Sequence, residues 1–216
     1  MHVDRPQTLG EEIANAISHG IGFLLAVASL PILLMSDTVR GAMSITAVSV
    51  FSATMMVLYL ASAVYHALPQ GTLKRAFQRL DHASIFLFIA GSYMPFVLGP
   101  LRGPWGWSLF GVVWAMAVTG MLAKGLDRLK HPWISTGLYV AMGWVALVAI
   151  VPMVQRIEAG GLALLVGGGV SYTLGALFFL LDNRVRYAHF VWHLFVMGGS
   201  FCHFLAALWY APTVIA

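Results

Sequence analysis

Histidine residues with the spacing of a helical metal site occur near the end of the chain. His189 and His193, in the segment HFVWH, are four residues apart, so both imidazoles would project from one face of a helix. A third histidine, His66, ends the segment SAVYH, in which Ser62 stands one helical turn earlier. Three neutral imidazoles and one open position form a known catalytic zinc arrangement, in which the ion acidifies water and polarises a carbonyl group.

Further polar residues could serve such a site. Asp81 would orient a ligand or a metal-bound water, and Ser62 could hydrogen-bond an imidazole or that water. The segment EEIANAISHG adds Glu12, Asn15 and His19, which form a polar stripe on one helix face. These three are expected to brace the bundle near the site and are weaker candidates as ligands. Zn²⁺ is favoured because Mg²⁺ requires more carboxylates, although imidazole also suits copper, iron and nickel.

The elements that must position these residues are membrane-spanning helices. Of the 216 residues, 60% are hydrophobic and only 9% are charged, and the mean hydropathy is +0.84. Soluble domains carry roughly 25% charged residues, and a helix crosses a bilayer with about 20 apolar residues. We therefore predict an all-α integral membrane protein, with residues 1–216 as one seven-helix transmembrane domain. The helices are expected near residues 12–35, 43–68, 82–100, 105–124, 132–152, 160–181 and 187–210.

The distribution of positive charge predicts the orientation of the bundle. Nine lysine and arginine residues fall on the side of the N-terminus, namely Arg5, Lys74, Arg75, Arg79, Lys124, Arg128, Lys130, Arg184 and Arg186. Only three fall on the opposite side, namely Arg40, Arg102 and Arg156. By the positive-inside rule the N-terminus is cytoplasmic and the C-terminus is outside. This orientation argues against receptors coupled to G proteins, and the last span has no lysine for a retinal Schiff base.

The predicted spans place the candidate residues in one layer near the cytoplasmic face. His66 lies near the end of the second span, Asp81 opens the third, and His189 and His193 lie in the first two turns of the seventh. A lone histidine in a membrane helix more often makes an interhelical hydrogen bond than binds a metal, so the case rests on three histidines at matching depth. His203 is about 15 Å further along its helix and is expected to pack or to lie at an interface.

The joint motif set resembles the progestin and adipoQ receptor family. The signature segments are SAVYH, from Ser62 to His66, then Asp81, then HFVWH, from His189 to His193. The stretches LDHASIFLFIAGSYMPF and WHLFVMGGSFCHF resemble the bacterial hemolysin III branch still more closely, a branch that includes a membrane-homeostasis protein. The resemblance implies a location in the bacterial inner membrane and zinc held by the three histidines, with Ser62 and Asp81 around the catalytic water. It also implies ceramidase-like amide hydrolysis, as in eukaryotic members.

Three classes of function stay open at this point. The first is an intramembrane zinc hydrolase of lipid amide or ester bonds, and the second is a non-catalytic regulator of membrane homeostasis with a structural zinc. The third is a cytolytic pore, which is weakest because a water-filled path needs polar residues through the whole membrane depth. Membrane lipids are the expected partners. No basic, aromatic-rich patch suggests nucleic acid, and the long N-terminal domain of the hormone receptors is absent from this sequence.

Overall fold

The structure, a computed structural model, describes residues 5–211, and this part of the chain is helical without any strand. Six spans are continuous helices, and α5, η1 and α6 together make up the remaining span. The all-α, seven-span prediction is therefore confirmed. The helices are α1 (Leu9–Leu34), α2 (Gly41–Ala67), α3 (Thr72–Val97), α4 (Pro104–Gly125), α5 (Pro132–Gly143), the 3₁₀ helix η1 (Trp144–Ala149), α6 (Ile150–Arg156), α7 (Ala159–Leu181) and α8 (Ala188–Tyr210).

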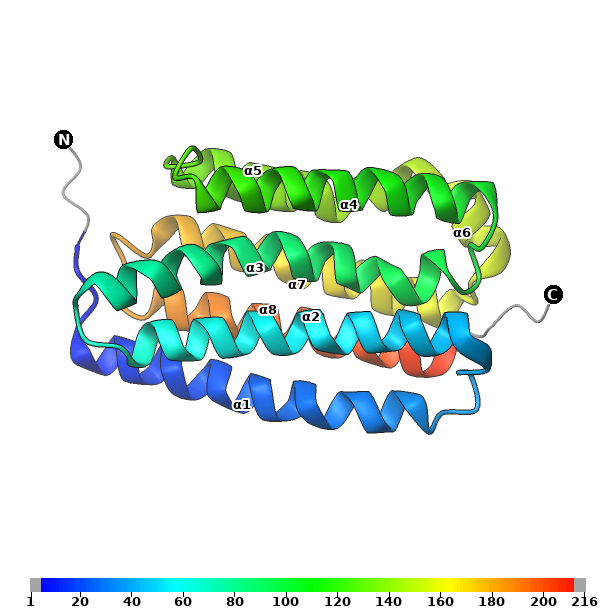
Figure 1. Cartoon of the computed structure of the whole chain (residues 1–216), viewed down its shortest axis with the longest axis horizontal. Coiled ribbons are helices and arrows are strands. Elements are labelled where there is room, and N and C mark those ends of the chain that lie inside the picture. The colour runs from blue at the N-terminus through cyan, green and yellow to red at the C-terminus, as the bar shows by residue number, and fades with distance from the viewer. Residues whose placement is uncertain (1–4, 212–216) are drawn as a thin grey trace.

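The spans lie alongside one another as a bundle (Figure 1). The start of α1, in blue, and the end of α8, in red, lie at opposite ends. Because the spans alternate in direction, the end of α2 and the starts of α3 and α8 lie at the same end as the start of α1. The histidine-bearing segments therefore meet at one end of the bundle, and the side of the membrane that this end faces stays a prediction.

The start of the third helix was predicted wrongly. The sequence placed it at residue 82, whereas α3 begins at Thr72, so that Asp81 is the tenth residue of the helix and does not open it. The charged residues before Asp81, among them Arg75 and Arg79, do not interrupt the helix, because long cationic side chains can leave a helix toward the membrane interface. The third helix therefore extends beyond the apolar run that revealed it.

The fifth span also differs from its prediction. The sequence suggested a break at Pro152, but Pro152 is buried within α6, and the span continues to Arg156. Proline is tolerated there because it lies in the first turn of α6, where no helical hydrogen bond is lost. The irregular part is η1, where Tyr93 of α3 donates to the carbonyl of Met142 at 2.9 Å and accepts from the N–H of Ala146 at 3.1 Å.

Small residues let the helices that carry the site approach closely. A Cβ atom added at Gly22 of α1 would lie 2.8 Å from the ring of Tyr59 in α2, and one at Gly91 of α3 would overlap the side chain of Thr54 in α2. Ser29 and Ser52 join α1 to α2 through their hydroxyl groups at 3.1 Å. Such contacts are expected within lipid, where close packing and interhelical hydrogen bonds take the place of the hydrophobic effect.

Candidate metal centre

Three histidines form a buried cluster between α2 and α8. His66 lies on the last turn of α2, and His189 and His193 lie on the first two turns of α8. Their ring centroids are 4.8 to 5.2 Å apart, and one nitrogen from each can be chosen so that all three lie within 4.8 Å of one another. The three residues are at most 7% exposed. This geometry can hold one metal ion, and the role of the three histidines as ligands stays a prediction.

Carboxylates orient two of the three imidazoles. The Nδ1 atom of His66 lies 2.7 Å from Glu12 of α1, and the Nδ1 atom of His189 lies 2.9 Å from Asp182 in the α7–α8 connection. Since a carboxylate only accepts hydrogen bonds, both Nδ1 atoms carry the proton. The Nε2 atoms of both rings are then left with a lone pair, and neither has a partner among residues 5–211. A carboxylate on the outer nitrogen of a histidine ligand is the usual arrangement in metal sites.

A serine sets the same tautomer on the third imidazole. The hydroxyl of Ser18 donates its single proton to the carbonyl of Asn15 at 2.9 Å. The same hydroxyl lies 3.0 Å from Nδ1 of His193, so it must accept a proton from that nitrogen. The buried Nε2 atom of His193 is consequently deprotonated, and it too lacks a partner in the described part of the chain. All three histidines thus present a free Nε2 lone pair, which is the state that binds Zn²⁺.

Glu12 is itself held in place by a buried cation. Lys74 of α3 lies 3.0 Å from the second carboxylate oxygen of Glu12. The same ammonium group donates to the carbonyls of Tyr65 and Leu68, at 2.9 and 3.1 Å, where α2 ends. One lysine therefore joins α1, α2 and α3 in the layer of His66. Glu12 therefore contacts both His66 and Lys74, and its predicted bracing role stays a prediction.

A second carboxylate fixes the start of α8. Glu11 closes a capping box with Thr8 at the start of α1, and it accepts the N–H of Tyr187 at 2.9 Å. Tyr187 precedes α8 in a left-handed conformation with φ of 60°. Arg5 donates twice to Glu11 and also reaches the carbonyl of Asp182 at 3.4 Å, and the ion pair raises the pKa of the Arg5 guanidinium. These bonds position the connection that carries the partner of His189.

Asp81 and Ser62 lie together beside this cluster. Ser62 stands one turn from His66 on α2, and its hydroxyl faces the carboxyl group of Asp81 without a hydrogen bond of ordinary geometry. Both side chains are at most 2% exposed. Neither the Ser62 hydroxyl nor the Oδ2 atom of Asp81 has a partner within residues 5–211. A buried carboxyl with a free oxygen is expensive in a membrane helix unless it acts on a ligand or on water.

His19 and Asn15 complete the polar layer from the side of α1. The ring of His19 stacks on His193 with centroids 3.4 Å apart and planes 8° apart, and its edge faces Tyr59. Both nitrogens of His19 are buried without a partner in the described chain. Asn15 donates to the side chain of Gln7 at 2.7 Å. His19 thus stacks on the ring of a candidate ligand, and its predicted bracing role stays a prediction.

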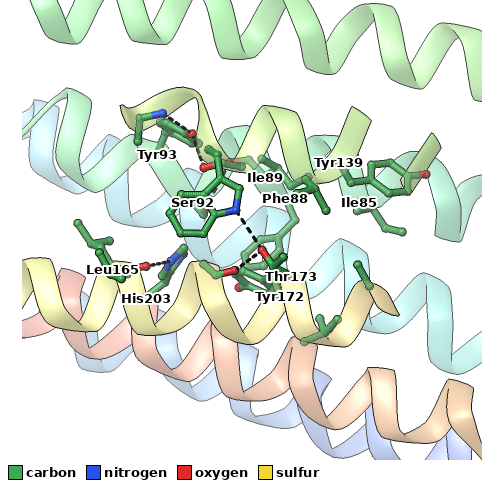
Figure 2. Close-up of a pocket in the computed structure, with 18 of the residues that line it drawn as sticks. Ile85, Phe88, Ile89, Ser92, Tyr93, Tyr139, Leu165, Tyr172, Thr173 and His203 are labelled. Atoms are coloured by element: carbon green, nitrogen blue, oxygen red, sulfur yellow. Dashed lines mark hydrogen bonds between the residues drawn. The ribbon is translucent and has the colours of Figure 1, made fainter. Parts of the chain in front are cut away.

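A cavity of about 420 Å³ extends from this layer into the bundle. Asp81 and His19 line it at the end that carries the metal cluster. Figure 2 shows its central part, where Ile85, Phe88, Ile89, Ser92 and Tyr93 of α3 face Tyr172 and Thr173 of α7 and His203 of α8. The walls are mainly apolar and aromatic with a few polar groups, which is typical of a site for a small, largely apolar ligand.

The remaining histidines of the described chain lie away from the three-histidine cluster. His82, next to Asp81, packs edge-on against Phe179 of α7. His203 lines the cavity and lies 3.4 Å from the carbonyl of Leu165. The expectation that His203 packs away from the metal layer agrees with this position, but the sequence did not reveal that it faces a cavity.

Sequence reasoning missed two residues of the site. Asp182 and Ser18 were not among the predicted site residues, yet each lies at the Nδ1 atom of a candidate ligand. Asp182 stands seven residues before His189, and no fixed spacing relates a loop residue to a helical ligand. A search for acidic residues just outside the spans and near each histidine would have found Asp182.

Comparison with known proteins identifies the family of this chain. Residues 7–204 match the family model described as haemolysin-III related. Hemolysin-3 of Bacillus cereus is 41% identical, with 96% of this chain and 95% of that protein covered, and a Hemolysin-3 homolog of Bacillus subtilis is 36% identical over 96% and 97%. The human monocyte to macrophage differentiation factor is 28% identical over 95% and 88%. The chain therefore belongs to the haemolysin-III related family, the branch of the progestin and adipoQ receptor family that its motifs indicated.

Proposed function

We propose that this chain is a zinc-dependent hydrolase, set in the inner membrane of a bacterium, that cleaves an amide or ester bond of a membrane lipid. The observation that carries the proposal is the combination of three free Nε2 atoms with a buried carboxyl that has one unpartnered oxygen, at the head of an apolar cavity. The biological role would be in the homeostasis of membrane lipids or membrane energetics. The amide bond is favoured by the ceramidase-like activity of the wider family.

The donor set of the cluster fits zinc. His66, His189 and His193 would hold the ion through Nε2, with Glu12, Asp182 and Ser18 fixing the rings from behind. When bound, zinc supplies Lewis-acid chemistry, in which a carbonyl is polarised and water becomes more acidic near neutral pH. Structural zinc sites usually have four protein ligands, so a set of three histidines favours an open, catalytic position.

The residues around the cluster have separate tasks in the proposed reaction. Asp81 takes the proton of the attacking water and later returns it to the leaving nitrogen or oxygen, so no charge is stranded in the apolar layer. Ser62, beside the Asp81 carboxyl, orients the water through its hydroxyl. The cavity receives the hydrocarbon part of the substrate, which places the bond to be cleaved next to Asp81.

Two other functions compete with hydrolysis. Zinc that only braces the bundle would make the chain a non-catalytic regulator, and this reading accounts for the histidines but leaves the free Asp81 oxygen without a purpose. Two of the similar proteins carry the name hemolysin-3, so cytolysis is the third candidate. A water-filled pore needs polar groups through the whole depth of the membrane, whereas the cavity walls here are mainly apolar.

The variant Asp81→Asn separates chemistry from bracing. It preserves the shape of the side chain and removes the base, so zinc content and thermal stability should stay near wild type. Turnover of the substrate, found by comparing the lipids of cells with and without the active chain, should fall by roughly 10²- to 10⁴-fold. A His189→Ala/His193→Ala double variant should lose the metal and serves as the metal-free control. Full activity of Asp81→Asn with full zinc would refute the mechanism, and loss of zinc would make Asp81 a ligand.

A further inference from the structure

A second cavity, of about 410 Å³, lies at the same end of the bundle as the histidine cluster. It is formed by the first turns of α3, the end of α4 and the start of α5, and we call it the basic pocket. The charged residues that line it are four cations and one carboxylate, namely Arg75, Arg79, Lys124, Lys130 and Asp127. These charged residues lie at or beyond the ends of the predicted apolar runs, which is the level where lipid headgroups meet a membrane protein.

The single carboxylate leaves most of this positive charge uncompensated. Asp127 pairs with Lys130 at 3.4 Å, and both side chains are more than half exposed. The ammonium group of Lys124 donates to the carbonyl of Leu129 at 2.8 Å, which orients it without neutralising its charge. Arg75 donates to the hydroxyl of Thr72 at 3.2 Å, also a neutral acceptor. Several cations with free donor capacity around one hollow are the arrangement that binds phosphate.

The basic pocket adjoins the apolar cavity. Phe179 of α7 lines both. On α3, Asp81 lines the apolar cavity while the next residue, His82, lines the basic pocket. On α5, Thr136 lines the apolar cavity and the preceding residue, Ser135, lines the basic pocket. The ring of Phe179 packs near both His82 and His189, with centroids 6.3 and 5.8 Å away, so it lies between elements of the basic pocket and of the metal layer.

We propose that the basic pocket binds the phosphate-bearing headgroup of an anionic phospholipid, and that one acyl chain of this lipid passes Phe179 into the apolar cavity. Juxtaposed cationic and apolar spaces match the two parts of such a lipid, and basic pockets between helices on the cytoplasmic side are typical sites for anionic headgroups. A lipid held in this way would run past Asp81 with the bonds between headgroup and chain nearest the carboxyl. The substrate class of the proposed hydrolase is then an anionic phospholipid, and the bond to be cleaved is an acyl ester, the second of the two bond types in the proposed function.

The identification of this lipid as the substrate rests on the proposed function. The binding of the lipid does not, because binding requires no metal. Binding and turnover can therefore fail separately. Anionic lipid bound at the pocket without any cleavage would refute the hydrolase and leave the site intact. Cleavage of a neutral lipid with no binding of anionic lipid would refute the headgroup site and leave the hydrolase intact.

The binding test uses the full chain in a neutral detergent, titrated with short-chain phosphatidylglycerol and, separately, phosphatidylcholine. One molecule of phosphatidylglycerol should bind per chain, at least tenfold more tightly than phosphatidylcholine. The variant Arg79→Gln/Lys124→Gln should bind it about thirtyfold more weakly, at roughly a factor of five per cation. If this variant fails to fold, as judged by helical content, the single variant Arg79→Gln should show about a fivefold loss.

A matched control removes the same charge from the same end of the bundle. Arg128 and Arg184 are exposed there and do not line the basic pocket. The variant Arg128→Gln/Arg184→Gln should bind phosphatidylglycerol as wild type does. An equal loss in both double variants would show a general attraction to the positive surface and overturn the proposal. Inorganic phosphate binding as tightly as phosphatidylglycerol would overturn the lipid assignment in favour of free phosphate.

The path of the acyl chain has its own test. A phosphatidylglycerol with a photoreactive group midway along one chain should crosslink to residues of the apolar cavity such as Tyr93, Trp144 or His203, as read by mass spectrometry of peptides. Val118 of α4 is 47% exposed on the outer surface of the bundle and reports on ordinary surrounding lipid. Crosslinks at positions such as Val118, with none in the cavity, would overturn the proposed path.

Discussion

Asp182 offers the sharpest test of how the metal centre is built, because it acts on zinc only through His189. Its carboxylate holds Nδ1 of His189 at 2.9 Å, and the two side chains are 19% and 8% exposed. Loss of such an outer partner weakens metal affinity typically 10- to 100-fold, or about 1.4–2.7 kcal/mol. Asp182→Ala removes the acceptor and should show this full loss. Asp182→Asn retains a carbonyl oxygen that accepts from Nδ1, and a neutral acceptor is roughly half as strong, so a loss of only about three- to tenfold is expected.

The assay is competition for zinc between the purified chain and a chromophoric chelator of known affinity. Asp127→Ala is the control, because Asp127 is an exposed carboxylate at the same end of the bundle that pairs with Lys130 and contacts no ring of the cluster. Affinities should fall in the order wild type and Asp127→Ala, then Asp182→Asn, then Asp182→Ala. Wild-type affinity in Asp182→Ala would show that the histidine rings need no outer partner, and it would refute the tautomer argument for this site.

Three further predictions test packing, charge and orientation. Gly106→Ala should lower the free energy of unfolding by about 2 kcal/mol, because the new Cβ atom would overlap the carbonyl of Val97. Gly111→Ala on the same helix is the control, since its Cβ atom would meet nothing within 4 Å. Thermal unfolding in detergent compares the two variants, and equal melting temperatures would contradict this packing. Lys74→Met should destabilise the bundle by about 3 kcal/mol in the same assay, since it removes the cation that lies 3.0 Å from the carboxylate of Glu12. An unchanged melting temperature would show that this ion pair contributes nothing to stability. Single-cysteine variants labelled from outside the cell should react at Arg102→Cys but not at Arg75→Cys, and the reverse would invert the topology.

The meeting of the three histidines was predictable because a membrane makes depth readable from sequence. Each span must cross the same thickness at 1.5 Å per residue, so His66, His189 and His193 were expected at one level before any contact was known. Which faces of α2 and α8 turn toward each other does not follow from apolar periodicity, since every helix in lipid is apolar on most sides. Here the polar spacing of the histidines carried the prediction, and it succeeded.

The parts of the site that escaped prediction lie where depth gives no guide. Asp182 comes from a connection, whose path depends on the bonds that Glu11 makes to Tyr187 and that Arg5 makes across the bundle. Ser18 points at His193 only because α1 packs beside α8 at one particular rotation. The start of α3 was missed because Lys74 reads as an interfacial charge, although it is 5% exposed and pairs inside the bundle. A charged residue next to an apolar run therefore does not by itself mark the end of a helix.

The positions of the unpartnered polar atoms indicate where the fold binds its ligands. A buried polar atom without a hydrogen bond costs about 1–3 kcal/mol, and a stable bundle has few of them. Within residues 5–211, apart from the Nε atom of Arg5, every such side-chain atom lies in the metal layer or lines the apolar cavity. The residues concerned are Asn15, His19, Ser62, His66, Asp81, His189 and His193 in the layer, and Thr136 and His203 along the cavity. Packing alone would not gather these costs along one continuous path, whereas an ion at the three imidazoles would satisfy the Nε2 atoms of His66, His189 and His193 together.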